Sequence, residues 1–139
     1  MGFTRYYSKE LNFLFVDITG ELNDNDLTSH VKALNTETEG LVNVKGFADC
    51  RGITKVNIKT IEVVSNAVNE KYKPGSKVVI FVPKDNELIF AMARAYQMFA
   101  EESCDEVSIY RDYDEALAWL TDSPAEGQAL TEFINTHKK

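Results

Sequence analysis

A continuous run of apolar residues constrains the fold more than any other feature of this sequence. Residues 78–82 read Val-Val-Ile-Phe-Val, with no polar position within the run. Such a run predicts a strand that is buried on both faces, as in parallel sheets covered by helices. The segments on either side, about 57–72 and 85–102, carry apolar residues at helical spacing. A strand between two amphipathic helices predicts an α/β protein with right-handed crossovers.

Short strands and capped helices are expected over the rest of the chain. Residues 3–8 and 11–18 each fit a strand, and the short gap between them predicts an antiparallel hairpin. A helix is expected after each of Asn23, Asp112 and Ser123, because their side chains can accept a hydrogen bond from a first-turn N–H. Further strands are expected at 42–50, with a bulge at Gly46, and at 106–110.

The resulting order is ββαβαβαβα plus a C-terminal helix. Alternation of strands and helices favours parallel neighbours, while the first strand is antiparallel to the second. We therefore predict an α/β fold with a mixed, mainly parallel five-stranded sheet and packed helices. A length of 139 residues suits one domain. We expect a single domain over 1–139, in which 123–139 form a C-terminal helical extension.

Composition and charge exclude several classes of partner. With 15 basic and 22 acidic residues, the formal net charge is −7, which disfavours binding to nucleic acid. The apolar stretches are shorter than the ~18 residues that a membrane span needs, and the first residues contain no apolar signal core. Cys50 and Cys104 are far apart in the sequence and are expected to be free thiols. We therefore expect a cytoplasmic protein.

Residues suited to catalysis are few. The histidines are His30, beside the apolar stripe of a predicted helix, and His137, near the end of the chain. Asp17 and Asp49 lie toward the ends of predicted strands, where α/β sheets often bind ligands. These residues form no recognisable catalytic constellation, and no glycine-rich phosphate motif is present. We therefore expect no enzyme activity, no metal and no cofactor.

One helix face is expected to need a cover. Phe90, Arg94 and Met98 lie four residues apart, on the side of the 85–102 helix that faces away from its core stripe of Leu88, Ile89, Met92, Tyr96 and Phe99. The cover is predicted to be the C-terminal helix or a second subunit, and the alternative is that this row forms the wall of a ligand cleft. This row is the candidate interface, and it makes a homodimer one of the expected assemblies.

Two segments resemble a known family. Residues 16–23 read Val-Asp-Ile-Thr-Gly-Glu-Leu-Asn, which is similar to the entry to the first helix of STAS domains, the anti-sigma-factor-antagonist fold, with Asn23 where the family often has Asp. Residues 115–120 read Glu-Ala-Leu-Ala-Trp-Leu, which resembles the SpoIIAA-like branch, a relative of the CRAL-TRIO (Sec14-like) fold. The resemblance covers about 3–120. It implies a regulatory or protein-interaction module.

The chain departs from this family at the regulatory site. Typical antagonists resemble one another in an Asp-Ser-Ser-Gly stretch at the start of the second helix, where a kinase phosphorylates a serine. The matching stretch here is Asn57-Ile58-Lys59-Thr60, which contains no serine. The resemblance therefore does not carry over the phosphorylation switch. Because helix N-termini attract anions, Asn57, Lys59 and Thr60 are kept as a candidate partner or anion site.

Besides an enzyme that would use Asp17, Asp49 or His30, which form no recognisable constellation, two functions remain open. The first is a non-catalytic regulatory or protein-interaction module. The alternative is a carrier or sensor of a small apolar or lipid-like ligand, which the Sec14-like relationship suggests. Its candidate pocket residues are four aromatic side chains on neighbouring elements: Tyr96, Phe99, Tyr113 and Trp119. A ligand-sized cavity would favour the second function.

Overall fold

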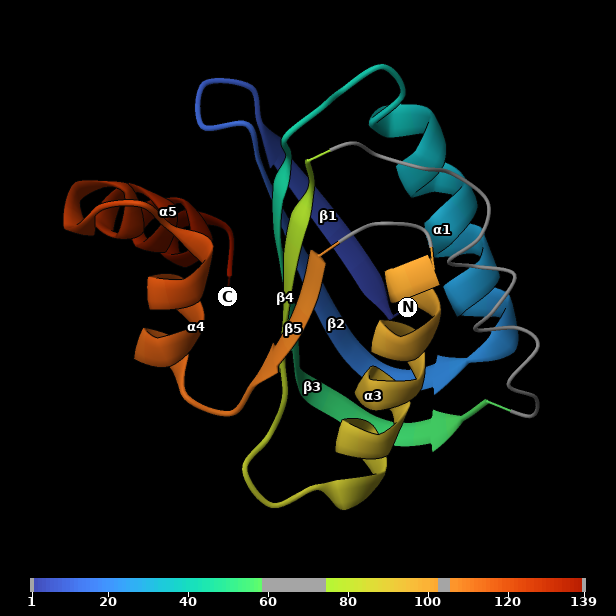
Figure 1. The fold of residues 1–139 in the computed structure, drawn as a ribbon. Helices are drawn as coiled ribbons and strands as arrows, with labels where there is room; N and C mark the ends of the chain where they lie inside the picture. Colours follow the sequence, from blue (N-terminus) through green and yellow to red (C-terminus); the bar gives the residue numbers. More distant parts are fainter. Residues whose placement is uncertain (1, 59–74, 103–105, 139) are drawn as a thin grey trace.

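The computed structural model describes residues 2–58, 75–102 and 106–138. Within them, one five-stranded sheet has the order β1-β2-β3-β4-β5 (Figure 1). The strands are β1 (Phe3–Ser8), β2 (Phe13–Asn23), β3 (Lys45–Asn57), β4 (Lys77–Phe81) and β5 (Glu106–Tyr110). The helices are α1 (Asp24–Glu37), α3 (Glu87–Glu102), α4 (Tyr113–Leu120) and α5 (Pro124–His137). The predicted mixed α/β fold is confirmed.

The strand directions follow from the connections. β1 and β2 form the predicted antiparallel hairpin, in which Phe3 pairs with Ile18 and Ser8 with Phe13. The other neighbouring strands pair in parallel. The hairpin turn includes Asn12 at a φ of 49°, a left-handed conformation that asparagine tolerates better than most residues. β2 therefore begins at Phe13 rather than at residue 11.

The three predicted N-caps are present. The Asn23 side chain accepts a hydrogen bond from the Asp26 backbone N–H at 2.9 Å and begins α1. Asp112 caps α4 through the Glu115 N–H at 3.0 Å. Ser123 caps α5 in the same way, with Pro124 in the first turn. These caps fix the points at which the chain leaves the sheet and enters each helix.

One prediction for the centre of the sheet is wrong. Gly46 forms no bulge, because its pairing with Leu14 and Val78 is regular. The irregularities lie instead in the β2–β3 ladder, between Asp17 and Thr19 and between Gly20 and Glu21. There the strands approach so closely that a Cβ on Gly52 would lie 2.7 Å from the Thr19 side chain.

The second predicted helix does not begin at Asn57. β3 continues to that residue, because the extended end of β2 supplies a pairing partner for it at Asn23. From residue 59 onward, the helix predicted over 57–72 lies outside the described residues.

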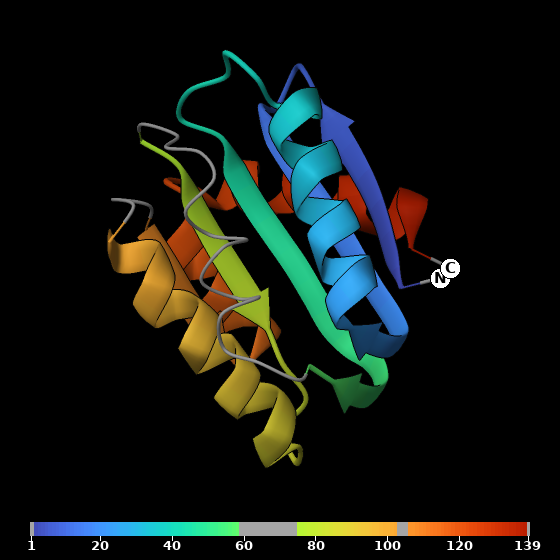
Figure 2. The ribbon, with the colours of Figure 1, turned by 90° about the vertical axis from the view of Figure 1, so that its right-hand side faces the viewer.

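Helices cover both faces of the sheet. Helices α1 and α3 lie over one face, and α4 and α5 lie over the other (Figures 1 and 2). Side chains alternate between the faces along each strand. Leu14 and Val16 of β2 therefore join the core under α1 and α3, whereas Phe13 and Phe15 join the core under α4 and α5.

Helix α5 is part of the second core. Leu130 and Ile134 are buried there with Phe47, and Phe133 packs edge-on against Phe13 with ring centroids 5.8 Å apart. The C-terminal helix was one of the predicted covers for the outer side of α3. That prediction is wrong, because α5 lies on the opposite face of the sheet.

Candidate functional site

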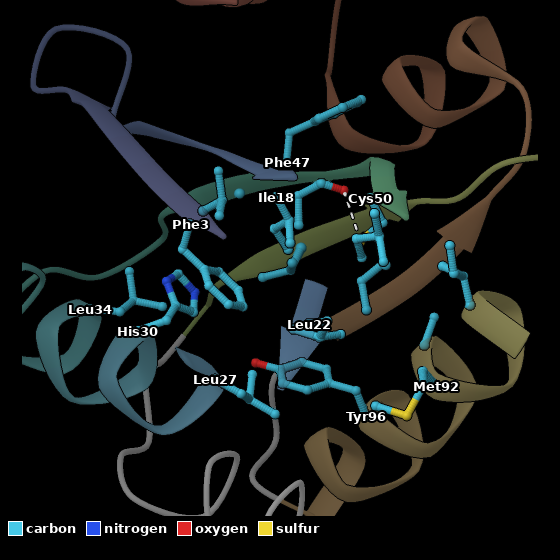
Figure 3. Close-up of a pocket in the computed structure, with 18 of the residues that line it drawn as sticks. Phe3, Ile18, Leu22, Leu27, His30, Leu34, Phe47, Cys50, Met92 and Tyr96 are labelled. Atoms are coloured by element: carbon cyan, nitrogen blue, oxygen red, sulfur yellow. Dashed lines mark hydrogen bonds between the residues drawn. The ribbon is translucent and has the colours of Figure 1, made fainter. Parts of the chain in front are cut away.

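An apolar cavity of about 160 Å³ lies between the sheet and the helices α1 and α3 (Figure 3). Its described walls come from alternate positions of the strands and from one face of each helix. Strand residues in the walls include Leu14, Val16, Ile18, Cys50, Ile53 and Ile80. Helix residues in the walls include Leu27, His30 and Leu34 of α1 and Ile89, Met92, Ala93 and Tyr96 of α3.

Small residues leave room for the cavity. β3 presents Gly46, Ala48 and Cys50 at successive alternate positions on this face, and α3 presents Ala93 opposite the sheet. The helical wall follows a regular spacing, with Ile89, Ala93 and Tyr96 on one side of α3. In Figure 3, Tyr96 extends from α3 toward Leu27 of α1.

His30 is the polar side chain at the α1 wall of this cavity. Its ring stacks on Phe3, with ring centroids 4.4 Å apart. Its Nδ1 lies 3.4 Å from Nη1 of Arg5, and Arg5 also donates to the Glu37 carboxylate at 2.9 Å. Burial, together with the positive charge of Arg5, lowers the pKa of His30 to about 4. The ring is therefore neutral at pH 7.

The position of the His30 proton follows from its neighbour. Arginine carries only donors, so Nδ1 of His30 is the acceptor of this contact. The neutral ring then holds its proton on Nε2. His30 lines the cavity, whereas Arg5 is not among its described walls. The sequence prediction placed His30 on the flank of the helix and did not foresee this contact.

Cys50 contributes an unreactive thiol to the wall. It is buried, and burial together with the nearby Asp49 carboxylate raises its pKa to about 12. Since the thiolate is the nucleophilic form, Cys50 behaves at neutral pH as a small apolar side chain. Cys50 is free, as expected, whereas Cys104 lies outside the described residues.

The four predicted pocket residues do not come together. Tyr96 lines the cavity. Tyr113 and Trp119 lie on the opposite face, where Tyr113 packs against Phe47 at 5.7 Å and Trp119 covers the Lys77 ammonium at 4.4 Å. The Phe99 side chain is outside the described part of the chain.

The candidate interface on α3 is only partly exposed. The Arg111 guanidinium lies 4.4 Å above the Phe90 ring, which is partly buried. Arg94 is exposed and hydrogen-bonds Gln97 on its own helix. Met98 is 60% exposed and Leu88, which was expected in the core stripe, is 58% exposed. The exposed apolar surface of α3 therefore consists mainly of Leu88 and Met98.

The candidate anion site at the second helix gains no support from the described residues. Asn57 ends β3 and pairs with Asn23 of β2. Lys59 and Thr60 lie outside the described part of the chain.

A buried ionic network lies near the middle of β2 and β3, on the α5 face. Asp49 is 1% exposed and accepts hydrogen bonds from the Arg51 backbone N–H at 3.0 Å, from Arg51 Nη2 at 2.9 Å and from Lys138 Nζ. Asp17, its partner in the β2–β3 ladder, lies 3.4 Å from the same ammonium. Burial alone would raise the pKa of Asp49, but the hydrogen bonds from Arg51 and Lys138 outweigh it and lower that pKa.

In this network, Asp17 and Asp49 are both held by cations of the same chain. Sequence reasoning missed the network because Lys138 is 89 residues from Asp49 and looked like part of a solvated tail. The one available signal was that both aspartates sit at matching positions of adjacent strands.

Within residues 2–58, 75–102 and 106–138, no three or more His, Cys, Asp or Glu side chains form a group suited to a metal ion. None of the helices described here has the length and apolar character needed to cross a membrane.

Comparison with known proteins identifies the fold class. The mixed sheet with helices on both faces is a SpoIIAA-like fold. It is similar to the solved structure of an uncharacterized protein of the DUF3478 family with a SpoIIAA-like fold from Shewanella loihica PV-4. The TM-score is 0.58 at 18% sequence identity, over 86% of this chain and 92% of that one. No protein-family model and no curated protein match the chain. The predicted SpoIIAA-like fold is thus confirmed, while the CRAL-TRIO relationship stays a prediction.

Proposed function

We propose that this chain is a non-catalytic regulatory module that binds a small apolar molecule in the cavity under α1 and α3. The observation that carries the proposal is the cavity itself, which measures about 160 Å³ and has mainly aliphatic and aromatic walls. An apolar cavity of about 150 Å³ is large enough to bind benzene. The occupant that fits is therefore a molecule about the size of a single ring.

The chemistry around the cavity supports binding rather than catalysis. His30 is neutral, and its Nδ1 already contacts Arg5. Cys50 is a protonated thiol. Asp17 and Asp49 lie on the other face of the sheet and are paired with Lys138. A neutral, apolar cavity favours uptake of an uncharged molecule by transfer out of water.

Filling the cavity from within is expected to weaken binding. Ala93 is 7% exposed and lines the cavity from α3, so the longer side chain of Ala93→Met would occupy the space. We expect benzene to bind the wild-type protein with saturable methyl NMR shifts at Ile80 and Met92. In Ala93→Met, the affinity for benzene should fall at least about tenfold while thermal stability is retained, because filling a cavity commonly stabilises.

The matched control is Ala91→Met. Ala91 lies on the exposed side of the same helix, so this variant adds the same side chain without entering the cavity. It should bind benzene as the wild-type protein does. Equal affinity in Ala93→Met and Ala91→Met, or benzene shifts scattered away from the cavity walls, would contradict the proposed function.

A second candidate is self-association through α3, favoured by the exposure of Leu88 and Met98 on that helix. The proposed partner is a second copy of this chain. We expect sedimentation velocity to show a dimer that Met98→Asp converts to a monomer, because a buried unpaired charge opposes association. Ser29→Asp, on the exposed side of α1, adds the same charge and should leave the dimer intact. A monomeric wild-type protein rules this candidate out.

A further inference from the structure

We propose that His30 selects the occupant of the cavity, which is an uncharged single-ring compound with one hydrogen-bond acceptor, such as an aromatic ketone or aldehyde. The acceptor oxygen would bind His30 Nε2–H while the ring fills the apolar space. This inference rests on the proposed function of the cavity and adds to it the chemical class of the ligand.

The orientation of His30 is fixed by Phe3, which shares the cavity wall, and by Arg5, which is not among the described walls. Phe3 stacks against its ring at 4.4 Å, and Arg5 Nη1 lies 3.4 Å from Nδ1. Arg5 is itself held by two contacts to Glu37, at 2.9 and 3.3 Å. Because Arg5 can only donate, it keeps Nδ1 unprotonated and leaves the ring proton on Nε2. The cavity wall thus carries a hydrogen-bond donor that is held in place before any ligand arrives.

The other described wall residues with a polar side-chain atom able to donate are Cys50 and Tyr96. The Cys50 thiol is a weak donor, and its Sγ lies 4.0 Å from the Ala48 carbonyl oxygen of its own strand. Tyr96 already takes part in another interaction. His30 is therefore the side chain best placed to distinguish a ligand with an acceptor from one without.

The described walls disfavour ionic ligands at the same site. The described walls contain no Asp, Glu, Lys or Arg. A carboxylate or ammonium group would lose its hydration there without meeting an opposite charge, which is strongly unfavourable. The ligand class is consequently neutral, even though Arg5 lies just behind His30.

Three probes and two variants test this assignment. Acetophenone, ethylbenzene and benzoate have similar rings but differ in carrying a neutral acceptor, no acceptor or a negative charge. Binding of each is measured by methyl NMR titration of the full chain. His30→Phe keeps a ring and removes the donor, whereas His30→Gln places an amide N–H close to the position of Nε2–H.

The wild-type protein should bind acetophenone about threefold to tenfold more tightly than ethylbenzene, the gain expected of one net hydrogen bond. His30→Phe should lose this preference while still binding ethylbenzene, and His30→Gln should retain part of it. Benzoate should not bind.

Failure of the inference is distinguishable from failure of the proposed function. If ethylbenzene and acetophenone bind the wild-type protein equally well, or if benzoate binds more tightly than either, the cavity binds ligands but His30 does not select them as proposed. A preference that survives in His30→Phe overturns the assignment to His30 as well. If none of the probes binds at the cavity walls, the proposed function itself is wrong.

Discussion

Replacing Asp49 by asparagine is expected to lower the free energy of unfolding by about 3 kcal/mol, the lower end of the range for breaking a buried ion pair. Asp49 is 1% exposed, and its carboxylate accepts hydrogen bonds from both Arg51 and Lys138. Asparagine has nearly the same shape, but its side-chain N–H₂ group would face these donors and cannot accept hydrogen bonds from them. The loss stays at the lower end because the side chains of Arg51 and Lys138, 49% and 29% exposed, can turn toward water.

Urea unfolding at pH 7 measures this loss, and Asp17→Asn is the matched control. Asp17 is the ladder partner of Asp49 and approaches the same lysine, but it is 18% exposed and lies 3.4 Å away. Its replacement should cost less than about 1 kcal/mol, as for partly exposed pairs. Equal losses in the two variants would show that burial of Asp49 is not what gives the network its strength.

The pH dependence of this difference has a defined sign. The folded state lowers the pKa of Asp49, whereas an unfolded aspartate has a pKa of about 3.9. The stabilising contribution of the carboxylate is therefore complete above about pH 4 and is lost as the pH falls through the pKa of the folded state. The stability gap between the wild-type protein and Asp49→Asn should accordingly shrink in acid.

Local signals in the sequence predicted most elements of the fold. The caps Asn23, Asp112 and Ser123 act through N–H groups only three residues away, so no tertiary information is needed to recognise them. The buried strand β4 was likewise visible as one apolar run. By contrast, the ends of β2 and β3 depend on pairing between Asn23 and Asn57, two residues that each carry a turn-forming side chain and look like loop positions in isolation.

The composition of the site was harder to predict, because it depends on which face of the sheet each helix covers. Strands β2 to β5 are parallel and follow one another in sequence order. Right-handed crossovers then place α1 and α3 on the same face. Helix α4 follows the last strand and does not connect two strands of the sheet. The rule for crossovers therefore does not determine which face α4 covers. Tyr113 and Trp119 consequently pack on the other face from Tyr96.

The cavity had a sequence signal that could have been used. Gly46, Ala48 and Cys50 place three small side chains at alternate positions of a central strand, on the face that meets α1 and α3. Helix α3 adds Ala93 on the facing side. Small residues on both sides of an interface leave space when the helices are held apart by larger neighbours such as Met92 and Tyr96. The position of His30 beside this space requires the tertiary contact of β1 with α1.

Acid is expected to destabilise the wild-type protein more than His30→Gln, by about 3 kcal/mol between pH 7 and pH 4. In the folded protein the pKa of His30 is lowered to about 4, first by burial and then by Arg5. In the unfolded chain a histidine has a pKa of about 6.5. Between these values the unfolded chain binds a proton that the folded protein does not. The stability due to neutral His30 is therefore complete above about pH 6.5 and is lost as the pH falls toward the pKa of the folded state.

Urea unfolding of both proteins across this range isolates the effect of one residue. Glutamine does not titrate, and the carboxylates, including Glu37 beside Arg5, titrate in both proteins and so largely cancel in the difference. A parallel pH dependence in the two proteins would mean that the folded protein accepts a proton on His30 as readily as the unfolded chain does. The imidazole would then be hydrated rather than buried against Phe3. In that case the ring proton would no longer be confined to Nε2 near neutral pH, and the cavity would lack the fixed donor on which the selection of a ligand with a hydrogen-bond acceptor depends.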